Sequence, residues 1–183
     1  MTSRILGAVL AFCAAAFATS AHAYDRGLDM RTLAHAGVPR SYGIYTPASA
    51  NGAEPAPLII ALHGRFSSAQ ALHALSGLAA VADARGAVLL YSETLGDLWN
   101  DGGHAALQRR EPAQDDAGFI EAAIAAVSAE RAIDPARVYV LGYDVGGSMA
   151  FRLACGARPL AGVAVVSALM WDYAEQGCSN AQQ

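Results

Sequence analysis

The sequence predicts an α/β fold built on a mostly parallel sheet. Short continuous apolar runs, typical of strands that are buried on both faces, lie at residues 58–62, 87–91, 138–141 and 162–169. Segments with apolar residues at helical spacing separate these runs. Because strands that alternate with helices pair in parallel through right-handed crossovers, we expect one sheet covered by helices.

The first 23 residues have the features of a secretory signal peptide. Arg4 gives a positive n-region, residues 5–17 an apolar core, and residues 21–23 (AHA) a small-residue cleavage site. We favour a signal peptide over an N-terminal anchor because the apolar run is short for a membrane span. The prediction is a secreted or periplasmic chain of residues 24–183, a single incomplete domain with no membrane association after cleavage.

Two elements are expected to surround the first buried strand. Residues 30–36 and 40–46 flank Gly37-Val38-Pro39 and predict an antiparallel hairpin before it. After it, apolar residues at helical spacing predict one helix over 67–85, which Gly86 ends.

A long polar segment, residues 92–112, follows the second strand. It is too long for a simple connector, so it is a candidate functional loop in which we expect Trp99 to anchor the chain by packing. The next helix begins at Asp115 and Asp116, and a further helix is expected over 146–155.

Composition limits the partners. All twelve basic residues are arginines and the net charge is −4, so nucleic acid is not expected as a ligand. The histidines are scattered and no C-x-x-C motif occurs, so we expect neither a metal site nor a cofactor. With Cys13 in the signal peptide, Cys155 and Cys178 remain as a predicted disulfide, the alternative being two buried thiols.

Several short motifs, taken in order, resemble the secreted polyhydroxybutyrate depolymerases and the feruloyl and acetyl-xylan esterases, a family of α/β-hydrolases. The resemblance covers residues 31–170. The matching pieces are PLIIALHG (57–64), WNDG (99–102), DD (115–116) with FI (119–120), Asp134 with RVYVLG (137–142), GG (146–147), MA (149–150) and AC (154–155).

This resemblance implies ester hydrolysis by a serine nucleophile, an acid and a histidine base, on a small-molecule or polymeric ester of the polyester or plant-cell-wall type. It implies an α/β-hydrolase fold with a sharp nucleophile elbow after the third strand. The oxyanion hole would use the N–H group of Val145 and one from the loop after His63 and Gly64, at Arg65 or Phe66.

Two departures predict a catalytically impaired protein. In the elbow frame Gly142-Tyr143-Asp144-Val145-Gly146, Asp144 stands where the family has serine. No histidine follows Asp144, although the fold places its base there, so we expect the domain to be truncated at its C-terminus. A non-catalytic binding module is the alternative to an impaired esterase.

Three roles stay open for Asp144. Its side chain could cap the following helix, since aspartate is among the best N-caps. It could bind a ligand, or it could act as a nucleophile, because the elbows of epoxide hydrolases and haloalkane dehalogenases resemble Gly-x-Asp-x-Gly. Ser148, in the shifted frame Gly146-Gly147-Ser148, would lie past the elbow and is a poorer nucleophile candidate.

The loop after the first buried strand is expected to face Asp144. We predict that the guanidinium of Arg65 pairs with the Asp144 carboxylate, the alternative being that it points to solvent. His63 belongs to the oxyanion loop as a structural residue, and His104 is a loop histidine with a view of the site. The oligomeric state is not predicted.

Overall fold

The computed structural model describes residues 27–50, 52, 54–103 and 114–170 of the 183-residue chain. Within these residues the chain forms six strands and four helices. They are β1 (Asp29–His35), β2 (Val38–Tyr45), β3 (Ala56–Leu62), α2 (Ala69–Ser76), α3 (Leu78–Arg85), β4 (Val88–Ser92), α5 (Asp116–Glu130), β5 (Ile133–Tyr143), α6 (Val145–Ala154) and β6 (Gly162–Val166).

The strands form one sheet in the order β1-β2-β4-β3-β5-β6. β1 and β2 are an antiparallel hairpin, and β2 pairs antiparallel with β4, whereas β4, β3, β5 and β6 are mutually parallel. The predicted fold class, a mostly parallel sheet with an N-terminal hairpin, is confirmed. Leu62 is in register with both Ser92 and Gly142, so the segments after β3, β4 and β5 leave the sheet at one edge.

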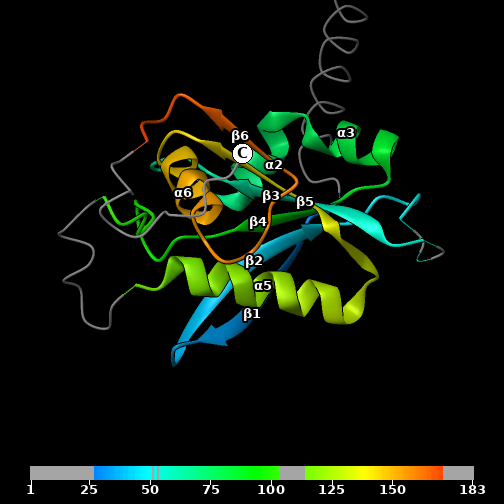
Figure 1. The fold of residues 1–183 in the computed structure, drawn as a ribbon, viewed down its shortest axis with the longest axis horizontal. Helices are drawn as coiled ribbons and strands as arrows, with labels where there is room; N and C mark the ends of the chain where they lie inside the picture. The colour runs from blue at the N-terminus through cyan, green and yellow to red at the C-terminus, as the bar shows by residue number, and fades with distance from the viewer. Residues whose placement is uncertain (1–26, 51, 53, 104–113, 171–183) are drawn as a thin grey trace, which may run out of the picture.

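Two helical layers cover this sheet (Figure 1). Alternate residues of β3 point to opposite faces, as the two-residue period of a strand requires. Leu58, Ile60 and Leu62 pack in the larger core with α5 and α6, whereas Ala61 packs in a smaller core with α2 and α3. Because helices pack on both faces of the sheet, the ends of the strands and the loops that follow them are held in place.

The predicted helix over 67–85 is wrong in one respect, because it is two helices. Gly77 adopts φ 69° and ψ 5°, a left-handed conformation that ends α2 and precedes α3. Ser68 caps α2, its hydroxyl accepting a hydrogen bond from the Ala71 N–H at 3.1 Å. The break separates two short helices that both pack in the smaller core.

The strand bounds differ from the prediction at both ends of the chain. In the hairpin, Ala36 and Gly37 have φ values of 50° and 79° and form the turn, while Val38 already belongs to β2. Two consecutive residues with positive φ match the twist of a two-residue hairpin. β6 ends at Val166, before the predicted residue 169, because Ser167 has φ 54° and leaves the extended conformation.

Candidate functional site

The turn between β5 and α6 has the geometry of a nucleophile elbow. Asp144 adopts φ 54° and ψ −126°, a conformation that costs a non-glycine residue about 1–3 kcal/mol. Its N–H donates to the Val166 carbonyl at 2.9 Å, and its carbonyl accepts from the Gly147 N–H at 2.8 Å. β6 and α6 therefore hold the backbone of Asp144 in its strained conformation from both sides.

Glycines let the backbone approach closely around this turn. A Cβ on Gly142 would collide with the Gly146 carbonyl, and a Cβ on Gly146 would collide with the Leu62 carbonyl. On Gly64, a Cβ would lie 2.9 Å from the Tyr143 ring and 3.0 Å from the Asp144 Cβ. The glycines of the elbow frame thus bring the end of β3 against the start of α6.

The Asp144 carboxylate binds the loop that follows β3. Its Oδ2 accepts a hydrogen bond from the Arg65 N–H at 2.8 Å. Asp144 occupies the N-cap position of α6, but its side chain makes no capping hydrogen bond, so the predicted side-chain cap is wrong. The carboxylate reaches across to the neighbouring loop instead, and among the hydrogen bonds of the described residues none involves Oδ1.

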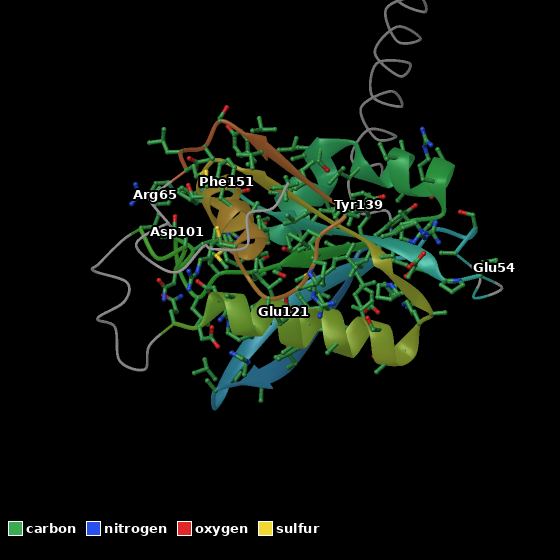
Figure 2. All side chains as sticks on the ribbon, viewed as in Figure 1. Glu54, Arg65, Asp101, Glu121, Tyr139 and Phe151 are labelled. Atoms are coloured by element: carbon green, nitrogen blue, oxygen red, sulfur yellow. The ribbon has the colours of Figure 1, made fainter. Side chains whose placement is uncertain are left out.

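The predicted ion pair between Arg65 and Asp144 is also wrong. In the described part of the chain no ion pair joins them, and the guanidinium carbon of Arg65 lies 5.3 Å from the centroid of the Phe66 ring. Phe66 has φ 55° and its side chain is 80% exposed, so the loop turns outward after Arg65. The main chain of Arg65 thus faces the elbow while its side chain lies outside, at one end of the molecule (Figure 2).

His63 supports the oxyanion loop from beneath. The ring is buried, with Nδ1 2.9 Å from the Gly64 carbonyl oxygen and Nε2 3.1 Å from Oε2 of Glu93. The His63 carbonyl accepts a hydrogen bond from the Trp99 indole at 2.9 Å. Both ring nitrogens therefore face groups other than Asp144. This arrangement is the one expected of a residue that positions the loop.

Trp99 anchors the segment after β4, as predicted. Its side chain is 1% exposed, and its ring centroid lies 5.3 Å from that of His63. Oε1 of Glu93 accepts from the Ala69 N–H at 2.7 Å, which ties the same segment to the start of α2. The loops after β3 and β4 form one packed unit below the elbow.

Sequence reasoning missed a buried ion pair at this edge. Nη2 of Arg40, on β2, lies 2.6 Å from Oδ1 of Asp116, and both side chains are at most 2% exposed. Oδ2 of Asp116 accepts from the Asn100 N–H at 2.6 Å, and Arg40 also donates to the Glu93 carbonyl at 3.0 Å. An arginine inside a short hairpin strand was the only signal, and it did not identify the partner.

A cavity of about 440 Å³ adjoins the elbow on the α2 side of the sheet. Its walls are mostly apolar and come from the loop after β3, from α2 and the start of α3, and from β5 and β6. They are Gly64, Ser67, Ala71, Leu72, Leu75, Ser76, Leu78, Leu141, Tyr143 and Val166. A larger cavity of about 630 Å³ lies between α5 and α6, lined by Gly118, Arg152 and Arg158 among others, and the elbow residues do not line it.

Several predicted features lie outside the described residues. These are the signal peptide (1–23), His104 and Cys178, so the disulfide stays a prediction, with Cys155 at the C-cap of α6. In the part of the chain that is described, no helix is long and apolar enough to cross a membrane. In that same part, His, Cys, Asp and Glu side chains form no group of three or more that could hold a metal ion.

Comparison with known proteins gives a consistent picture of the fold. No family model matches the chain. Over 131 residues, 71% of this chain, it is 34% identical to "Putative esterase NocK" of Nocardia uniformis subsp. tsuyamanensis, and it spans 38% of that protein's length.

Solved structures match over most of the chain. An acetyl xylan esterase from Aspergillus awamori matches with a TM-score of 0.64 at 19% identity, over 85% of this chain and 56% of its own. A ferulic acid esterase matches with a TM-score of 0.63 at 16% identity, over 78% and 58%. An S-formylglutathione hydrolase from Staphylococcus aureus matches with a TM-score of 0.62 at 12% identity, over 83% and 65%.

The chain therefore spans well under two thirds of NocK and of the two esterase structures. Its resemblance to esterase-type hydrolases extends from sequence to three-dimensional structure, and the chain has an α/β-hydrolase-like fold.

Proposed function

We propose that this chain is an exported protein of the esterase type of α/β-hydrolases in which ester hydrolysis is impaired, because Asp144 stands at the nucleophile position and its carboxylate occupies an oxyanion-hole donor. The similarity to NocK and to the acetyl xylan and ferulic acid esterase structures supports the esterase type. The predicted signal peptide over residues 1–23 supports export. The ligands we propose are polyester or plant-cell-wall esters, with no cofactor.

One observation carries the proposal, namely the hydrogen bond from the Arg65 N–H to Oδ2 of Asp144. In the esterase mechanism this N–H would stabilise the oxyanion that develops on the substrate. In this chain the Asp144 carboxylate already accepts the hydrogen bond of that N–H group. A second negative charge forming within a few ångströms is repelled, so the elbow disfavours the tetrahedral intermediate of ester cleavage.

The described histidines do not replace the base that the mechanism needs. Nε2 of His35 lies 2.9 Å from Oδ2 of Asp115, the N-cap residue of α5, whose side chain is exposed. The His73 ring packs against Tyr45 and Tyr91, with centroids 5.4 and 5.2 Å away. Together with the buried His63, all three rings are engaged away from Asp144.

A second candidate function rests on the two carboxylate oxygens of Asp144 being inequivalent. Oδ2 is held by the Arg65 N–H, and among the described residues Oδ1 has no hydrogen-bond partner. Oδ1 could therefore attack a saturated carbon: a C–O bond forms, the carbon–halogen bond of an alkyl halide breaks, and halide leaves with the electron pair. With no described histidine beside it to activate water, the resulting ester on Asp144 would accumulate.

Two assays on the exported chain test these candidates. We expect p-nitrophenyl acetate and butyrate to be hydrolysed at background rates by the wild type and by Asp144→Ala and Asp144→Ser. Turnover by the wild type that disappears in Asp144→Ala would overturn the main proposal. Incubation with 1-iodobutane followed by intact-mass measurement separates the second: a butyl adduct absent from Asp144→Asn supports a nucleophile, and an unmodified mass excludes it.

The same sample tests export. N-terminal sequencing of protein recovered from the periplasm or medium should begin at Tyr24. Recovery of the chain only from the cytoplasm, with Met1 or Thr2 at its N-terminus, would contradict this part of the proposal.

A further inference from the structure

The elbow carboxylate of Asp144 lies beside Gly64, and Gly64 lines the apolar cavity. The charge and the cavity together define a class of ligand. We propose that this site binds a small hydrophobic ammonium ion, with the cationic nitrogen at Asp144 and the alkyl or aryl group in the cavity. This inference rests on the proposed function, in which Asp144 is a fixed charge that does not take part in ester turnover.

Gly64 joins the two parts of the site. It lines the cavity, and a Cβ built on it would lie 3.2 Å from Oδ2 of Asp144 and 2.9 Å from the Tyr143 ring. The carboxylate and the aromatic ring thus lie against the same backbone position. A ligand that contacts Gly64 from the cavity has the negative charge and the ring within reach of its polar end.

The charge of this site favours a cation. Asp144 is half-buried and receives one hydrogen bond from a neutral N–H group, and the structure shows no ion pair between it and Arg65. A carboxylate in a partly enclosed position is stabilised by a positive charge held close to it, because burial removes part of its hydration. The guanidinium that could have supplied that partner lies beside the Phe66 ring.

The cavity walls favour an apolar body on that cation. The apolar lining residues come from α2, β5 and β6, and they are Leu72, Leu75, Leu141, Tyr143 and Val166. Leu75 and Tyr143 are 73% and 49% exposed, so burying them against a ligand would remove apolar surface from water. A volume of about 440 Å³ lies in the range of small-molecule sites.

The aromatic ring of Tyr143 adds a further preference. Quaternary ammonium groups bind to aromatic faces because the ring quadrupole attracts the charge. A quaternary ammonium group has no N–H group to donate to water. It is therefore less strongly hydrated than a primary ammonium group and loses less hydration free energy when it enters the site. Hexyltrimethylammonium, with a six-carbon chain for the cavity, is therefore the probe we choose.

Isothermal titration on the exported chain tests the proposal. We expect saturable binding of hexyltrimethylammonium, and at least about tenfold weaker binding by Asp144→Asn, which keeps the shape of the side chain but removes its charge. Glu54→Gln is the matched control, because it also removes one negative charge but lies at the opposite end of the molecule from Arg65 (Figure 2). Its affinity should equal that of the wild type.

A second variant and two further ligands test the cavity. Leu75→Gln changes an exposed wall residue, so it should fold normally and bind several-fold more weakly. Neutral 1-hexanol and anionic hexanoate should bind far less than the ammonium ion. Equal affinity in the wild type and Asp144→Asn, equal binding of hexanol, or no binding up to about 10 mM would overturn the inference.

The failure of this inference and that of the proposed function are distinguishable. Absence of ammonium binding in a protein that also leaves p-nitrophenyl esters intact removes only the ligand class. Ester turnover that depends on Asp144 would remove the proposed function, whatever the titration shows.

Discussion

Two aspartates lie at the same edge of the sheet and are held in opposite ways. Asp116, at the start of α5, is 1% exposed and binds the Arg40 guanidinium at 2.6 Å and the Asn100 N–H at 2.6 Å. Asp144, at the elbow, is half-buried and binds one backbone N–H. Both carboxylate oxygens of Asp116 bind groups of the protein. Of the two oxygens of Asp144, only Oδ2 has a hydrogen-bond partner among the described residues.

This difference separates a structural carboxylate, Asp116, from the candidate functional one, Asp144. A fully buried charge persists only where a countercharge and hydrogen bonds offset its desolvation, so Asp116 and Arg40 are bound to each other in the folded state. Asp144 carries backbone strain and has no countercharge among the described residues, which fits the cation site proposed above. The comparison predicts very different costs for removing each side chain.

The largest effect is expected for Asp116→Ala. The substitution leaves Arg40 buried without its partner, which costs about 3–5 kcal/mol of unfolding free energy. Urea unfolding followed by circular dichroism measures it. Glu121→Ala is the control, because it removes an exposed partner of Arg158 and should cost less than about 1 kcal/mol. Similar losses in the two variants would show that burial does not distinguish the pairs.

Gly142→Ala comes next in size. Its Cβ would collide with the Gly146 carbonyl, and both groups belong to backbone that cannot rotate away. Forcing β5 and α6 apart should cost about 1–3 kcal/mol. Gly162→Ala, whose Cβ would meet the Tyr139 ring at 3.2 Å, is the matched control, since a side chain can shift. An unchanged denaturation midpoint for Gly142→Ala would mean that the elbow is looser than the structure indicates.

Asp144→Ala should cost the least of the three substitutions. It removes one hydrogen bond to the Arg65 N–H, worth about 0.5–1.5 kcal/mol, and leaves no charge buried without a partner. Thermal unfolding beside Asp116→Ala gives the direct comparison. A loss as large as that of Asp116→Ala would indicate that Asp144 is a structural residue, and the contrast drawn above would fail.

The elbow and the sheet could be predicted from sequence because their signals are local. Apolar runs identify buried strands, and the glycines at 142 and 146 identify a close backbone turn whatever residue stands between them. The break at Gly77 was missed because the apolar spacing continues through it. Glycine inside a helical pattern does not reveal by itself that the backbone becomes left-handed.

The partners of charged groups could not be predicted. The sequence correctly predicted a contact between Arg65 and Asp144, but it predicted an ion pair between their side chains. The outward turn at Phe66, with φ 55°, presents the N–H group of Arg65 instead. Arg40 and Asp116 are separated by 76 residues, and only the folded sheet brings them together. Local patterns specify the backbone and leave the long-range pairing of charges open.

A third aspartate, Asp115, provides the smallest and most specific test. Burial opposes its ionisation, but the Gly118 N–H and the His35 ring, each 2.9 Å away, together hold the pKa of this carboxyl below its ordinary value of 3.8. A lowered pKa in the folded state means that the ionised group stabilises the fold. That contribution is complete above pH 3.8 and is lost as the pH falls through the lower, folded-state value.

Asp115→Asn isolates this contribution, because asparagine caps a helix as well as aspartate but carries no charge. The side chain of Asp115 is 55% exposed, so solvent screening keeps the expected loss below about 1 kcal/mol at pH 5–7. Unfolding free energies of wild type and variant should converge as the pH falls below 3.8, because the stabilisation is lost when Asp115 becomes protonated in the folded state. A difference that stays constant, or widens, as the pH falls would show that Asp115 acts only through its shape.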